Sequence, residues 1–138
     1  MNANEYIYII QKMKKVSDKR KEQLVEYADI KYDMSKSDQR CVFTGLIIKT
    51  GCDFDIHHIN GERENEHLVD RKYLFPCKRL YHNQYHDNSF NWLYRQEWYR
   101  GYLEFLKRGF PDLWDKEIYK PVRSGDMDME WYFEQIEK

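Results

Sequence analysis

Four of the five histidines in this 138-residue chain occur in two close pairs, and these pairs are the strongest constraint on its fold. His57 and His58 are adjacent and lie at the end of a short run of β-forming residues. His82 and His86 are four residues apart in a segment without glycine or proline. Residues four apart on a helix share one face, with Cβ atoms about 5–6 Å apart, which suits two ligands of one metal ion. The sequence therefore predicts a strand that ends at the doublet and a helix that carries the second pair.

The composition indicates one hydrophobic core and no membrane span. Mean hydropathy is −0.96, and no run approaches the ~20 apolar residues of a spanning helix. Aromatic residues make up 17% of the chain, and each large ring can bury roughly 150–250 Å². The N-terminus lacks the apolar stretch and cleavage site of a signal peptide, and an odd count of three cysteines points to a reducing compartment. We expect a single domain over residues 1–138 in a soluble, cytoplasmic protein without a membrane partner.

Apolar spacing and helix-ending residues predict a mixed α+β fold. Two short extended runs are expected over residues 54–59 and 73–76. Residues 35–39 form a polar loop, and the tail has a break at Pro121 followed by a turn. The predicted helices cover residues 4–15, about 18–32 after a cap at Ser17 or Asp18, 78–87, 90–108 with a stop at Gly109 and Pro111, and 127–136.

The doublet on the first run suggests two different roles for its histidines. Adjacent residues on a strand point to opposite sides, so His57 and His58 do not bind one ion together. One of them can act as a ligand while the other stays free to accept a proton as a neutral imidazole. With the helical pair, three nitrogen ligands and an open position are typical of a catalytic metal site. A metal ion beside a free base is suited to phosphodiester hydrolysis.

Three segments together resemble the HNH nuclease motif. They are Asp-Ile-His-His-Ile-Asn-Gly at 55–61, Tyr-Leu-Phe-Pro at 73–76 and His-Asn-Gln-Tyr-His at 82–86. The resemblance covers residues 41–87 and implies a ββα-metal unit, a short antiparallel hairpin and a helix, packed among flanking α-helices. Compact HNH proteins are common in phages and other mobile elements, which implies a bacterial or phage-infected host cell.

The resemblance also implies a role for each histidine. His57, His82 and His86 would be the metal ligands and His58 the general base, as in the three-histidine colicin-type nucleases. The implied function is a DNA endonuclease, a hydrolase whose single divalent ion stabilises the phosphate and the leaving oxygen. The products would carry a 5′-phosphate and a 3′-hydroxyl. RNA stays open as a substrate, and a non-catalytic HNH-like module that binds nucleic acid or protein is the second hypothesis.

The identity of the ion stays open at this point. Three imidazoles favour zinc, nickel, cobalt or manganese over magnesium, which prefers oxygen ligands. Asp55 shares a strand face with His57 and would make magnesium more plausible if it joined the ligands. A solvent-facing carboxylate is an equal alternative for Asp55.

Two departures from the motif concern its supporting residues. The middle Asn, which orients the loop that bears the base, falls on Tyr73 here, and Asp70, Asn65 and Asn60 are possible substitutes. The zinc-knuckle spacing that begins at Cys41 has Thr44 at its second cysteine position. We therefore expect hydrophobic packing, and no structural zinc, to hold this segment.

Several further residues receive weaker expectations. Arg71, Lys78 and Arg79 border the motif and are predicted phosphate contacts. His67, on the charged loop, is expected to be solvated. The aromatic residues over 92–105 could stack on bases, but their helical spacing is more typical of a core. Cys77 is expected to be a small buried residue.

Overall fold

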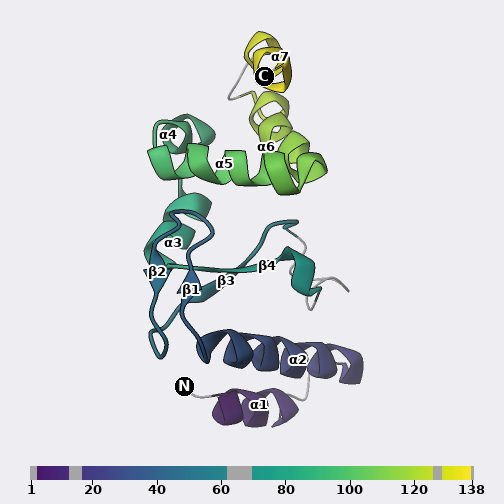
Figure 1. Cartoon of the computed structure of the whole chain (residues 1–138). Coiled ribbons are helices and arrows are strands. Elements are labelled where there is room, and N and C mark those ends of the chain that lie inside the picture. Colours follow the sequence, from purple (N-terminus) through teal and green to yellow (C-terminus); the bar gives the residue numbers. More distant parts are fainter. Residues whose placement is uncertain (1–2, 13–16, 62–69, 126–128, 138) are drawn as a thin grey trace. The chain divides into compact units, whose positions relative to one another are not determined.

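The computed structural model describes residues 3–12, 17–61, 70–125 and 129–137 (Figure 1). The chain forms two compact units. The first contains the described residues up to Cys41 together with those of Leu46–Cys77, and the second contains Val42–Gly45 and the described residues from Lys78 onward. A single domain over the whole chain stays a prediction.

Helices occur in both units and the two small hairpins lie in the first, which confirms the α+β class. The elements of the first unit are α1 (Ala3–Lys12), α2 (Asp18–Ser35), β1 (Gln39–Arg40), β2 (Ile47–Ile48), β3 (Asp55–His58), the 3-10 helix η2 (Arg71–Tyr73) and β4 (Leu74–Cys77). Those of the second are α3 (Arg79–Asp87), α4 (Phe90–Tyr94), α5 (Glu97–Gly109), α6 (Pro111–Arg123) and α7 (Met129–Glu137). The order β3, β4, α3 is that of a ββα unit along the chain.

The helix α2 begins where the sequence predicts. The Ser17 side chain accepts a hydrogen bond from the Arg20 backbone N–H at 3.2 Å and so caps the helix. Helix α1 packs against α2 (Figure 1), and the side chains of Ile10 and Ile30 are fully buried. The predicted first helix is confirmed to Lys12, and the rest of it lies outside the described residues.

The two predicted extended runs pair as the antiparallel strands β3 and β4. His57 lies opposite Phe75, and His58 lies opposite Leu74. The ladder continues beyond β3, since the Ile59 N–H donates to the Tyr73 carbonyl at 3.0 Å. The hairpin therefore fixes the backbone of both adjacent histidines.

The predicted loop over residues 35–39 is confirmed for residues 36–38, but Ser35 ends α2 and Gln39 begins a second hairpin, β1–β2. Gln39 belongs to β1 and lies opposite Ile48. The Cys41 N–H donates to the Leu46 carbonyl at 2.9 Å, and Gly45 takes a positive φ of 72° in the connection. Pairing with an apolar strand thus gives a polar segment a strand conformation that its own composition does not favour.

The prediction of one helix over residues 90–108 is wrong, because α4 ends at Tyr94 and α5 starts at Glu97. The Arg100 side chain donates to the Tyr94 carbonyl at 2.7 Å and satisfies the end of α4. Phe90 is buried on α4, and its ring lies 5.2 Å from that of Trp131 on α7. The break between α4 and α5 therefore occurs without a glycine or proline, and it accompanies aromatic packing between α4 and α7.

The predicted stop at Gly109 and Pro111 is confirmed, but the predicted break at Pro121 is wrong. Helix α5 ends at Gly109, and Pro111 is the first residue of α6. Pro121 lies inside α6, two residues before its end at Arg123. Pro121 has no N–H to donate to the carbonyl four residues before it, and the helix ends two residues later.

Aromatic side chains build the core of the second unit. Tyr99 and Tyr102 are each 1% exposed, which confirms the core assignment for these members of the 92–105 stripe. The Phe43 ring lies 4.9 Å from Tyr102, 5.2 Å from Tyr85 and 5.6 Å from Trp98. The segment that begins at Cys41 is expected to be held by hydrophobic packing, and Phe43 provides this packing.

We predict that Leu106→Ala lowers the free energy of unfolding by about 2–5 kcal/mol, because it leaves a cavity at a leucine that is 1% exposed. Urea denaturation measures the change. Leu80→Ala is the matched control, because Leu80 is 61% exposed and its truncation should change stability by less than about 0.5 kcal/mol. Equal losses in the two variants would contradict this assignment of the core.

Candidate metal centre

The helical histidine pair has the spacing of two ligands on one ion. The Nε2 atoms of His82 and His86 are 3.1 Å apart, and both rings lie on α3. Two nitrogens that bind one tetrahedral zinc at 2.0–2.1 Å are separated by about 3.3 Å. A distance of 3.1 Å is also that of an N–H···N hydrogen bond. The pair is therefore already close to the geometry that a metal ion requires.

Burial keeps one member of the pair in the form that binds metals. Partial burial lowers the pKa of His86, and the neighbouring His82 lowers it further. A lower pKa favours the neutral imidazole, which has a lone pair to donate. The neutral form of the His86 imidazole is therefore favoured near neutral pH.

His57, the third predicted ligand, lies in the first unit, whereas His82 and His86 lie in the second. The His57 side chain is buried, that of His82 is half-buried and that of His86 is exposed. Three imidazoles are the donor set of open catalytic sites. The role of each histidine as a ligand stays a prediction.

His58 follows His57 on β3, so the two side chains point to opposite sides of the strand. His58 is 7% exposed. The Tyr27 ring of α2 stacks on its imidazole, with ring centroids 5.7 Å apart and ring planes 13° apart. After the strand, the Gly61 N–H donates to the His58 carbonyl at 3.0 Å, and Gly61 has a φ of +69°. This turn needs the left-handed conformation that glycine tolerates.

Tyr73 occupies the position of the motif's middle Asn, and its backbone forms hydrogen bonds next to the doublet. The Tyr73 carbonyl accepts from the Ile59 N–H at 3.0 Å, and the Tyr73 N–H donates to the Asp70 carbonyl at 3.0 Å. The supporting roles predicted for Tyr73 and Asp70 stay predictions. Asn60 lies in the turn after β3. Asn65 and His67 lie outside the described residues.

Asp55 lies at the start of β3, opposite Cys77. Its carbonyl accepts from the Cys77 thiol at 3.5 Å. Cys77 is fully buried, as predicted. Participation of the Asp55 carboxylate in a metal site stays a prediction.

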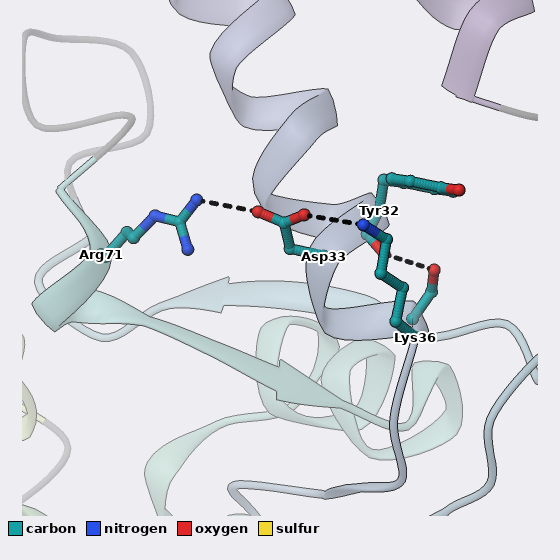
Figure 2. Close-up of polar contacts among 5 residues, drawn as sticks. Tyr32, Asp33, Lys36 and Arg71 are labelled. Atoms are coloured by element: carbon teal, nitrogen blue, oxygen red, sulfur yellow. Dashed lines mark hydrogen bonds and ion pairs between the residues drawn. The ribbon is translucent and has the colours of Figure 1, made fainter.

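The predicted phosphate contacts have different surroundings. Figure 2 shows that the Arg71 guanidinium faces Asp33 on α2, with Nη2 and Oδ2 3.2 Å apart. The same carboxylate lies 3.6 Å from the Lys36 ammonium. Lys78 precedes α3 as its N-cap residue, and Arg79 is the first residue of that helix and is exposed. Phosphate binding by these side chains stays a prediction, and at Arg71 it competes with an ion pair.

Sequence analysis missed a buried carboxylate that holds the helix of the histidine pair. The Tyr85 hydroxyl lies 3.0 Å from both oxygens of Glu117 on α6, and the Tyr99 hydroxyl donates to Oε1 at 2.8 Å. The Glu117 side chain is 11% exposed and has Lys120 at 3.8 Å. Burial, and then the charge of Glu117, raise the pKa of Tyr85 and of Tyr99, so both hydroxyls stay protonated donors. The three residues are far apart in sequence, and no local pattern connects them.

No protein-family model, curated protein or solved structure gives a significant match to this chain. Among the described helices, none has the length and apolar character needed to span a membrane. The case for a function therefore depends on the chemistry of the residues themselves.

We predict that Tyr85→Phe lowers the free energy of unfolding by about 1.5–3 kcal/mol, the range for a hydrogen bond to a charged group. The loss leaves Glu117 with fewer donors in a buried site. Urea denaturation measures it, with Tyr32→Phe as the matched control, because the Tyr32 ring is 52% exposed. A loss at Tyr85 no larger than that at Tyr32 would show that the buried hydroxyl does not stabilise α3.

Proposed function

We propose that this chain is a metal-dependent endonuclease of the HNH type that hydrolyses phosphodiester bonds in DNA. One observation carries the proposal: the Nε2 atoms of His82 and His86 lie 3.1 Å apart on α3, close to the spacing of two ligands on one ion. The resemblance to the motif adds His57 as the third ligand and His58 as the base. Base-assisted hydrolysis requires an imidazole that does not bind the ion, and His58 would supply it. The order of the strands and helix along the chain supports the same family.

In this proposal His57, His82 and His86 hold the ion. The ion, when bound, supplies positive charge that stabilises the phosphate and the leaving oxygen. His57 would come from β3 and the other two ligands from α3, and strands and helices hold side chains more precisely than loops. The nitrogen donors favour zinc, nickel, cobalt or manganese.

His58 accepts the proton in the hydrolytic step. As its imidazole takes a proton from water, the water oxygen forms a bond to phosphorus. The bond between phosphorus and the 3′ oxygen breaks, and that oxygen takes up a proton from solvent. The products are a 5′-phosphate and a 3′-hydroxyl, so atoms and charges balance without a further reactant.

The nucleic acid has access to the exposed member of the ligand group. His86 is exposed, and an open cavity of about 500 Å³ beside it is lined by residues that include Ser89, Glu117 and Lys120. At the start of the same helix, Lys78 and Arg79 offer positive charge to backbone phosphates. DNA is the proposed substrate because the motif resembles that of DNA nucleases, and RNA is the comparison that tests it.

We predict that His82→Ala and His86→Ala each raise the dissociation constant for Zn²⁺ by more than about tenfold, because each removes one direct ligand. Isothermal titration calorimetry measures the constant. Asn83→Ala, an exposed change on the same helix, should leave it unchanged. Equal Zn²⁺ affinity in the wild type and both histidine variants would remove the basis for the metal centre.

For the general base, we predict that His58→Ala lowers kcat for plasmid cleavage by about 10²- to 10⁴-fold. The dissociation constant for the metal should stay unchanged, because His58 is not a proposed ligand. The assay uses a panel of divalent ions, a chelator control and an RNA substrate of the same sequence. Cleavage that survives in His58→Ala but is abolished by the chelator would contradict the base assignment. Metal binding without cleavage in any ion would favour a non-catalytic binding module.

A further inference from the structure

Helix α2, outside the segment that resembles the motif, contacts the residues that precede β3. Tyr27 and Lys31 are four residues apart and share one face of α2. The Lys31 ammonium lies 3.8 Å from the Asp53 carboxylate and 5.6 Å from the centroid of the Phe54 ring. Both partners directly precede the strand that carries the histidine doublet. The Lys31 side chain therefore ties this face of α2 to the start of the strand.

A second tie connects α2 to the approach to β4. Asp33 pairs with Arg71 of η2 at 3.2 Å (Figure 2). The helix η2 directly precedes β4, which pairs with β3. Because α2 contacts the segments ahead of both strands, its position relative to the hairpin is defined from two sides. Each exposed pair contributes little to stability alone, and both involve residues of the helix that carries Tyr27.

The Tyr27 ring covers one face of the His58 imidazole. The ring planes are 13° apart at a centroid separation of 5.7 Å, and His58 is 7% exposed. The hairpin fixes the His58 backbone, and rotation about its side-chain torsions still determines the plane of the ring. A stacked neighbour disfavours rotations that would turn the imidazole edge into the tyrosine ring. The orientation of His58 thus depends on a residue from a different element.

We propose that Tyr27 is a positioning residue for His58. Its ring holds the imidazole in the plane from which one nitrogen can accept the proton of the attacking water. The inference rests on the proposed function, because it assigns a purpose to the orientation of the base. Tyr27 touches neither the substrate nor the ion in this account and acts only through His58.

The kinetic test compares variants that keep or lose the ring. Tyr27→Leu removes the stacking surface and should lower kcat for metal-dependent cleavage by about 10- to 100-fold, as expected for a misaligned catalytic group. KM and the dissociation constant for the metal should be unchanged, and Tyr27→Phe should restore kcat. Tyr32→Leu is the matched control on the same helix, because Tyr32 is 52% exposed. Its kcat should equal that of the wild type.

A second readout does not need activity. In NMR spectra of the chain with isotope-labelled histidine, the ring current of Tyr27 should shift the His58 ring protons. The shift should disappear in Tyr27→Leu and persist in Tyr27→Phe. If Tyr27→Leu does not fold, as judged by circular dichroism, Tyr27→Met takes its place with the same expected losses.

The outcomes separate this inference from the proposed function. A wild-type chain that cleaves, together with an unchanged kcat in the ring-deleted variant, overturns the positioning role alone. Equal losses of kcat in Tyr27→Leu and Tyr27→Phe overturn it as well, because the ring would then not be the group that matters. No cleavage by the wild type in any ion overturns the proposed function and this inference with it. A lower kcat that Tyr27→Phe restores, with the NMR shift lost only in Tyr27→Leu, supports it.

Discussion

The antiparallel ladder between β3 and β4 is the constraint on which the candidate centre depends. It sets His57 opposite Phe75 and His58 opposite Leu74. Because side chains alternate along a strand, this register sends the two adjacent imidazoles to opposite faces. A slip of one residue would exchange their positions. The bond from Ile59 to the Tyr73 carbonyl extends the pairing beyond the strand and makes such a slip less favourable.

Packing against helices gives this short hairpin its support, since two paired strands alone are marginally stable in water. In the first unit, α2 provides a ring stack on His58 and ion pairs on either side of the strands. In the second unit, the histidine pair lies on a helix that a buried carboxylate anchors. Glu117 accepts from Tyr85 on that helix and from Tyr99 on α5, so one acidic residue links three helices. Both units thus use aromatic side chains to hold the histidines.

Strong local signals were sufficient to predict several of the elements. The cap at Ser17, the stop at Gly109 and Pro111, and the two extended runs are all found as predicted. The predictions failed where distant residues determine the backbone. The break between α4 and α5 accompanies packing of Phe90 on Trp131, and β1 exists because an apolar strand pairs with it. Propensity is a weak guide in such places, because tertiary contacts outweigh it.

The sequence by itself determined the chemistry that is available at the centre. Helical and strand periods are local properties. The sequence therefore predicts that His82 and His86 share a helix face and that the adjacent His57 and His58 point to opposite sides of a strand. Only the tertiary structure decided which side chains orient them. Tyr27 reaches His58, and Glu117 reaches Tyr85, across long separations in the chain. No short-range periodicity encodes such contacts, because they arise when separate elements pack together.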